Sequence, residues 1–234
     1  MLILAIETSC MSGGASITSS GTVLGEITFK SRKTYSRRLT ASILYLMKEL
    51  DLTWDDLDLI ATGLGPGSFT GLRIGLATSK GFALAHSLDL LGVPTLDTIA
   101  ENAVLEDQRL ICPLMDARRS QVYASLYQPE FPNGPKRILD YLAVPPQELG
   151  KILPKENDIL FLGDGISCYR TLLQDIFKKR AAFAPSCLWY PKPSATGLLA
   201  ERMVMEKGER PADPALIMPL YCRLSEAEEN KLKK

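Results

Sequence analysis

The sequence contains few of the residues from which metal centres and nucleophilic sites are built. It has a single histidine, His86, and five scattered cysteines, with no pair at CxxC spacing. Zinc sites and Ser–His–Asp triads need histidines, cysteines or acids in defined combinations, and no GxSxG motif is present. We therefore expect no metal ligands and no catalytic residues in this chain.

Long hydrophobic runs and targeting segments are also missing. The apolar start of the chain has no cationic residues ahead of it, and no later apolar stretch reaches the length of a membrane-spanning helix. Lys plus Arg and Asp plus Glu total 27 each, so no overall basic field favours direct binding of nucleic acid. These features predict a soluble, cytoplasmic protein with reduced thiols and no membrane contact.

What the sequence does contain is a doubled order of strands and helices. Each half reads strand, strand, strand, helix, strand, helix, which predicts two related α/β lobes at 1–106 and 107–194, with a helix at about 195–208 packing back on the first. The expected strands are Leu2–Thr8, Gly14–Ser19, Thr22–Phe29, Leu59–Thr62, Leu91–Val93, Leu110–Met115, Gln121–Tyr127, Arg137–Val144 and Ile159–Leu162. The expected helices are Tyr35–Leu50, Leu72–Ala85, Thr98–Leu105, one near Pro145 and Ile166–Lys178.

The glycine-rich stretch 63–87 lies between a predicted strand and a predicted helix, where backbone N–H groups can bind an anion. It lacks the lysine and Ser/Thr of a P-loop, so glycines that only allow close packing are an equal alternative. A second glycine turn follows a strand of the second half, and an acid ends the first strand, where it could hold hydrated Mg²⁺. The candidate phosphate site comprises Glu7, Thr8, Ser9, Gly65, Gly67, Ser68, Gly163, Asp164 and Gly165.

The predicted helix Tyr35–Leu50 has apolar residues on two faces. Leu39, Ile43, Leu46 and Met47 follow each other at helical spacing, and a second face carries Ala41, Leu44 and Tyr45. Docking on one sheet needs a single apolar face, so the second implies either a wide core or a partner. The pattern leaves both interpretations open.

Several collinear segments resemble the bacterial TsaB (YeaZ) family of tRNA threonylcarbamoyladenosine biosynthesis proteins. GPGSFTGLRIGLATSKG at 65–81 is the most specific of them. The others are AIETS at 5–9, VPTLDTIA at 93–100, DARRSQVYASLY at 116–127, GDG at 163–165 and PLYCRLSEAE at 219–228. The resemblance covers both predicted lobes.

The resemblance implies the actin-like ATPase fold and a non-catalytic scaffold role beside the paralogue TsaD. That paralogue transfers a threonylcarbamoyl group to the adenosine next to the anticodon of ANN-decoding tRNAs, and the ATPase TsaE completes the complex. TsaD holds its metal with a histidine pair on the first helix, and Tyr35–Leu50 contains no histidine. A stand-alone kinase or ATPase, or a glycoprotease, is the alternative from another functional class.

The resemblance also implies that the two apolar helices bind TsaD, and the same surface would serve a homodimer of the isolated chain. The predicted interface residues are Leu39, Ile43, Leu46, Met47, Leu72, Leu76, Ser79, Ala83 and His86. Many relatives begin the first helix with histidine and serine, whereas this chain has Arg37 and Arg38 nearby, facing either tRNA, the partner or solvent. We expect no cofactor on this chain alone, with ATP or ADP and Mg²⁺ at the interface of the complex as the alternative, and tRNA contact only through the complex.

Overall fold

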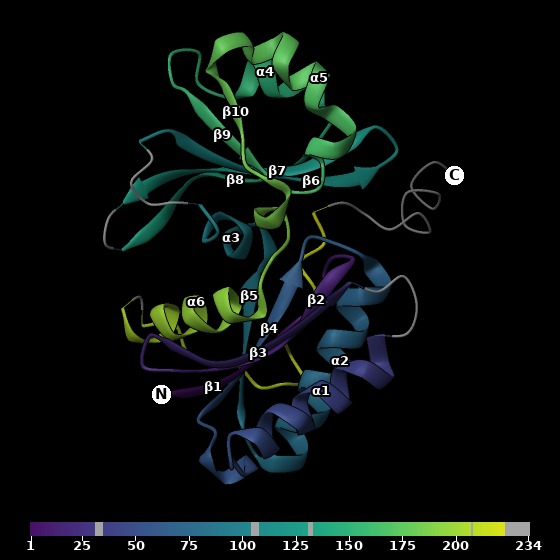
Figure 1. The fold of residues 1–234 in the computed structure, drawn as a ribbon, viewed down its shortest axis with the longest axis vertical. Coiled ribbons are helices and arrows are strands. Elements are labelled where there is room, and N and C mark those ends of the chain that lie inside the picture. The colour runs from purple at the N-terminus through teal and green to yellow at the C-terminus, as the bar shows by residue number, and fades with distance from the viewer. Residues whose placement is uncertain (31–34, 104–107, 131–132, 207, 223–234) are drawn as a thin grey trace.

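A computed structural model of the chain describes residues 1–30, 35–103, 108–130, 133–206 and 208–222. Two five-stranded mixed sheets, each flanked by helices, lie one above the other (Figure 1). The strands of the first sheet fall within the predicted first lobe and those of the second within the predicted second lobe. This is the two-lobed α/β architecture expected for the actin-like ATPase fold.

The first sheet has the strand order β3-β2-β1-β4-β5. β1 pairs antiparallel with β2 and parallel with β4 at the centre of the sheet, where its residues are almost entirely buried. The strands are β1 (Leu2–Glu7), β2 (Ser12–Ser19), β3 (Thr22–Lys30), β4 (Leu59–Gly65) and β5 (Asp89–Pro94).

Helices cover both faces of the first sheet because its side chains alternate between two cores. On one face Leu4, Ile6 and Ile60 pack with α1 (Tyr35–Glu49) and α2 (Phe69–His86). On the other face Ile3 and Ala5 pack with α6 (Pro193–Met205), which occupies the position expected for the helix at about 195–208. The short turn η1 (Trp54–Asp56) joins α1 to β4.

The second sheet repeats this topology in the order β10-β9-β6-β7-β8. Its strands are β6 (Leu110–Arg118), β7 (Gln121–Glu130), β8 (Gly134–Val144), β9 (Ile159–Leu162) and β10 (Ala181–Phe183), with the turns η2 (Pro146–Glu148), η3 (Lys178–Arg180) and η4 (Ser186–Leu188). The helices α4 (Leu149–Ile152) and α5 (Ile166–Phe177) cover one face. The short edge strand β10 was not predicted, because three residues carry too little pattern to indicate a strand.

The helix α3 (Thr95–Ala100) lies between the sheets, several residues earlier than the predicted helix Thr98–Leu105, whose last residues lie outside the described ranges. It starts at Thr95 because Pro94 precedes it and the Thr95 hydroxyl accepts a hydrogen bond from the Gly65 N–H at 3.1 Å. Its Asp97 accepts hydrogen bonds from Tyr127 and Tyr141 of the second lobe. Side-chain hydrogen bonds therefore fasten the lobes together.

The segment 209–222, here called the C-terminal strap, runs along the edge strand β5 and beside α2. Ala212 N–H donates to the Leu90 carbonyl at 3.1 Å, and Leu220 N–H donates to the Leu64 carbonyl at 2.8 Å. Between them Ile217 is buried in the core shared by α1 and α2. The strap thus covers a sheet edge that would otherwise expose unpaired backbone groups.

Within the described ranges, no helix is both long and apolar enough to cross a membrane.

Candidate functional site

The predicted phosphate residues of the first lobe come together where β1 ends and α2 begins. The Thr8 hydroxyl donates to the Gly71 carbonyl at 2.8 Å, and Ser68 N–H donates to the Ser9 carbonyl at 2.6 Å. Ser68 caps α2, because its hydroxyl accepts from Gly71 N–H at 3.3 Å. The N–H of Ser68 is therefore already bonded within the protein.

Glycine is required along this junction by the short distance between the two elements. A Cβ added at Gly67 would overlap the Ser9 carbonyl oxygen, and one added at Gly71 or Gly75 would overlap Thr8. Gly65 also has a φ of +99°, a conformation that glycine adopts without strain. The packing interpretation of the glycines is thus the one that the geometry supports.

Glu7 lies beneath this junction and is fully buried. Its Oε1 accepts the Ser9 N–H at 2.7 Å, whereas Oε2 has no hydrogen-bond partner among the described residues. Burial raises the pKa of the Glu7 carboxyl, and the hydrogen bonds from Ser9 only partly oppose this. The protonated form is favoured, so the carboxyl is poorly suited to attract a divalent cation.

The second glycine turn, at 163–165, is closed in a similar way. Gly163 has a φ of +110° and packs against the Leu114 carbonyl, which also accepts the Gly165 N–H at 3.1 Å. Asp164 accepts the Asp116 N–H at 3.2 Å, and burial raises the pKa of its carboxyl. The turn therefore uses its polar groups to join β6 to α5.

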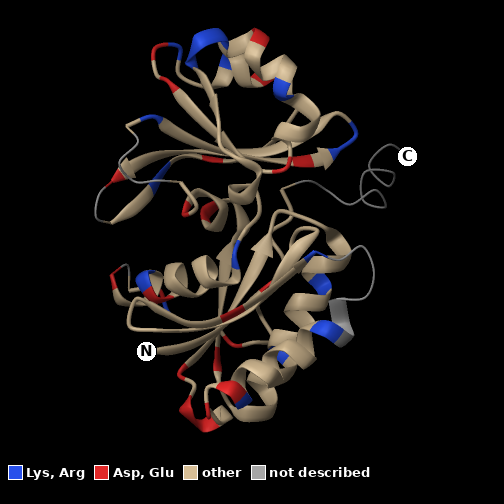
Figure 2. Cartoon of the chain, in the orientation of Figure 1, with Lys and Arg blue, Asp and Glu red and all other residues tan. Residues whose placement is uncertain are grey.

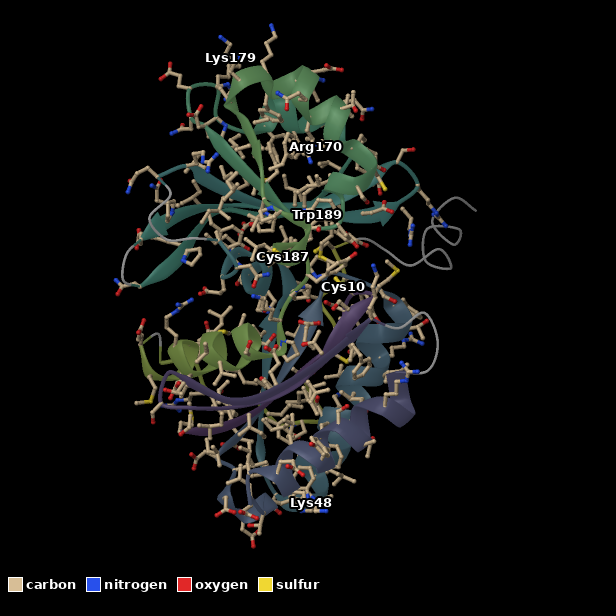
Figure 3. The ribbon with its side chains drawn as sticks, viewed as in Figure 1. Cys10, Lys48, Arg170, Lys179, Cys187 and Trp189 are labelled. Atoms are coloured by element: carbon tan, nitrogen blue, oxygen red, sulfur yellow. The ribbon has the colours of Figure 1, made fainter. Side chains whose placement is uncertain are left out.

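Cys10 lies between the two glycine turns, at the junction of the lobes (Figure 3). Burial raises the pKa of its thiol, and the Asp164 and Glu7 carboxyls raise it further. A thiol with a raised pKa is a poor nucleophile, so this cysteine is not activated for covalent catalysis.

These residues do not fit the ATP and Mg²⁺ that an actin-like ATPase fold implies. The carbonyl oxygens of Thr8 and Ser9 face the glycine loop, where a phosphate would meet partial negative charge. No three His, Cys, Asp or Glu side chains gather as metal ligands in the part of the chain that the structure describes. The structure gathers the candidate phosphate residues of each lobe, but as packing junctions.

A cavity of about 530 Å³ lies elsewhere, between α3, α6 and the hairpin of β7 and β8. Its charged walls are largely paired: Arg202 with Glu101, and Arg137 with Asp97 at 3.6 Å. These pairs join the lobes and leave few charges to bind a ligand.

The predicted interface residues of α1 and α2 are mostly wrong as contact residues. Every one except His86 is at most 7% exposed, because these side chains form the core beneath the helices: Leu39, Ile43, Leu46, Met47, Leu72, Leu76, Ser79 and Ala83. A charged residue at Leu76 or Ala83 would disrupt this core, so it would test folding rather than docking. The placement of an interface on the two helices stays a prediction.

The outer sides of α1 and α2 present a different apolar surface, here called the helix face. It consists of exposed residues on neighbouring helices: Ala41, Leu44, Tyr45, Ala77, Gly81 and Leu84. Leu44, Tyr45 and Leu84 are 50%, 55% and 65% exposed, which is high for large apolar side chains. The α1 members of this set are the second apolar face that the sequence contained.

Two side chains that the sequence singled out lie at the ends of these helices. His86 stacks on Trp54 at a centroid distance of 4.3 Å, which joins the end of α2 to η1. Arg38 is exposed near the start of α1, whereas the side chain of Arg37 lies outside the described residues.

Two glycines of α2 make a matched test of the junction. Gly75→Ala should lower the free energy of unfolding by about 1–3 kcal/mol, because the new methyl group overlaps Thr8. Gly81→Ala should raise it by about 1 kcal/mol, because nothing lies within 4 Å of the added Cβ and alanine favours the helix. Urea unfolding of both variants measures the difference. Equal effects would contradict the packing role of Gly75.

Glu7→Gln should change how stability depends on pH. The raised pKa means that the folded protein binds the Glu7 proton more tightly than the unfolded chain does. The contribution of Glu7 to the free energy of unfolding therefore falls as pH rises from about 4.5 through the folded pKa, by about 1.4 kcal/mol for each pH unit that separates the unfolded and folded pKa values. The variant should gain stability relative to the wild type between pH 5 and 8 in denaturant titrations. A constant difference across this range would argue against a protonated, buried Glu7.

Comparison with known proteins agrees with this fold. The model of the family "TsaD: tRNA N6-adenosine threonylcarbamoyltransferase" matches residues 22–231. The Bacillus subtilis tRNA threonylcarbamoyladenosine biosynthesis protein TsaB is 33% identical over 97% of this chain and 96% of its own length. The Escherichia coli protein of the same name is 33% identical over 55% of each chain.

Two solved structures from Pseudomonas aeruginosa share the fold. YeaZ superposes with a TM-score of 0.78 at 22% identity, covering 94% of this chain and 99% of its own. A protein described as similar to peptidase YEAZ has a TM-score of 0.81 at 24% identity, covering 95% and 99%. From the family model and the near-complete match to the Bacillus protein, the chain belongs to the TsaB (YeaZ) branch of the TsaD-related family.

Proposed function

We propose that this chain is a non-catalytic subunit in the synthesis of threonylcarbamoyladenosine in tRNA, and that it acts by binding the paralogue TsaD through the helix face. One observation carries this proposal: large apolar side chains on α1 and α2 are exposed side by side, although the sheet beneath them is already covered. Exposed apolar patches of this kind are typical of protein interfaces.

The shape of the helix face favours another helical surface as its partner. Gly81 lies in the middle of the exposed side of α2, where glycine costs about 1 kcal/mol relative to alanine and contacts nothing in this chain. Ala77 and Ala41 are also small, so the backbone of a partner helix can approach closely between the larger Leu44 and Leu84.

The junction beneath α2 supports a structural rather than a catalytic role. Its glycines and hydroxyl groups are used to seat the helix, and Glu7 is buried with a raised pKa. We therefore assign no cofactor to the isolated chain, and place any ATP or ADP with Mg²⁺ at the interface of the complex. TsaE completes the complex in the cytoplasm, and tRNA is bound through the assembled complex.

The kinase and glycoprotease alternatives gain nothing from the geometry. A kinase needs an accessible phosphate site and Mg²⁺ ligands. A glycoprotease needs a metal or an activated nucleophile. The described residues near the glycine turns provide neither set.

Leu84→Glu and Leu44→Glu should each weaken the complex with TsaD at least tenfold, because the charge would be buried without a partner in an apolar interface. Stability should change by no more than about 0.5 kcal/mol, because both side chains are exposed in the isolated chain. Titration calorimetry measures the binding. Ile138→Glu, on the second lobe at 49% exposure, is the matched control. Folded variants that bind TsaD as tightly as the wild type would refute the interface.

Reconstituted tRNA modification tests the function itself. TsaD, TsaE and the enzyme that supplies the threonylcarbamoyl donor should form modified tRNA only when this chain is added. Glu7→Gln should retain this activity, whereas Leu84→Glu should lose it in proportion to the loss of binding. Full activity without the chain, or loss of activity in a folded Glu7→Gln variant that still binds TsaD, would contradict a structural role.

A further inference from the structure

The two ends of the helix face carry opposite charge. α2 contains no acidic residue, and α1 contains only Glu49, at its last position. Arg38 and Arg73 are exposed near the starts of these helices. The segment 49–58, which follows the end of α1, reads ELDLTWDDLD.

The acidic segment lies at the ends of both helices. Trp54 stacks on Phe82 and His86, which places η1 against the last turns of α2. Exposed acids gather here: Glu49, Asp51, Asp55, Asp56, Asp58 and Asp89. Lys48 is the one lysine or arginine in 48–58 (Figure 3), and Figure 2 shows this end of the lobe as predominantly acidic.

The helices run in the same direction, so their charges add along the face. Both return from the carboxyl end of one strand to the start of the next parallel strand, because β3, β4 and β5 all run parallel to β1. The starts of α1 and α2 therefore form a basic end, with Arg38 and Arg73, and their last turns meet an acidic end.

This polarity does not stabilise the helices themselves. The dipole of a helix favours acids in its first turn and cations in its last. Neither helix has an acid in its first turn, and α1 ends in Glu49 followed by Asp51. Only Lys48 and His86 follow the favourable rule. The distribution of charge is better suited to a surface that must be recognised.

We propose that two copies of this chain pair through the helix face in antiparallel orientation, with the basic end of each copy over the acidic end of the other. A two-fold axis through the middle of the face satisfies both ends at once, because each contact is repeated in the symmetric position. A parallel arrangement would instead bring basic end to basic end and acidic end to acidic end.

The apolar residues supply the contact between these ends. On α1, Arg38, Ala41, Tyr45 and Glu49 follow each other at spacings of three or four, which places them along one side of the helix. On α2, Arg73 is followed by Ala77, Gly81 and Leu84. Each exposed stripe thus runs from a cation through apolar residues toward the acidic end.

Self-pairing would cover the same surface that the proposed function gives to TsaD, so this inference rests on that proposal for its biological meaning. The two complexes are mutually exclusive, and TsaD at excess should dissociate the homodimer. The pairing of two copies can nevertheless be measured without TsaD.

Charge reversal at one end tests the orientation. Arg38→Glu with Arg73→Glu makes both ends acidic, and Glu49→Lys with Asp55→Lys makes the acidic end largely basic. Each double variant alone should dimerise at least tenfold more weakly than the wild type in 50 mM salt, and an equimolar mixture should recover dimers. Sedimentation velocity measures the assembly, and circular dichroism confirms folding. Lys179→Glu with Asp175→Lys, near the end of α5 in the second lobe, is the matched control and should dimerise as the wild type does.

Salt gives the second readout, because exposed charges are screened within about 10 Å at 0.1 M ionic strength. Dimerisation of the wild type should weaken at least threefold between 50 and 500 mM salt. A wild type that stays monomeric at low salt, a dimer strengthened by salt, or folded double variants that dimerise unchanged would overturn the proposal. Retained binding of TsaD in those cases would leave the proposed function intact.

Discussion

The close approach of α2 to the end of β1 is the constraint on which the first lobe depends. Gly67, Gly71 and Gly75 allow the helix to lie directly against Thr8 and Ser9, and no larger residue could occupy these positions without moving the helix. The hydroxyl of Thr8 and the carbonyl of Ser9 then complete the seat with two hydrogen bonds. This packing determines where α2 begins, and because α1 packs beside α2, it also determines the surface that both helices present to solvent.

The same packing separates the chain from the ATPases whose architecture it shares. A phosphate loop must leave its N–H groups free and keep a carboxylate ionised near the metal. Here the loop N–H of Ser68 is bonded to Ser9, and the carboxyl of Glu7 is buried with a raised pKa. The hydrogen bonds that Asp97 accepts from the second lobe also hold the lobes together. The fold is therefore suited to presenting a rigid surface.

Much of this fold could be predicted from the sequence, because the strands and long helices of both lobes have strong apolar patterns. The orientation of the helices could not. α1 has two apolar sides, and periodicity alone does not tell which one faces the sheet, so Leu39 and Ile43 were assigned to the interface although they form the core. α2 is apolar almost all round, and the same ambiguity misplaced Leu76 and Ala83. An exposed glycine such as Gly81 was the signal for the outer side, but its exposure is known only once the helix is placed.

The C-terminal strap has a consequence for the order in which the chain folds during synthesis. The second sheet is built from one continuous segment, 110–183, which leaves the ribosome as a complete unit. The first lobe begins earlier in the chain, yet it waits for α6 and for Ile217 to fill its two cores and for the strap to cover β5. The N-terminal lobe is thus the last to be finished, and a ribosome that stops before residue 217 releases a chain whose first sheet still has an open edge.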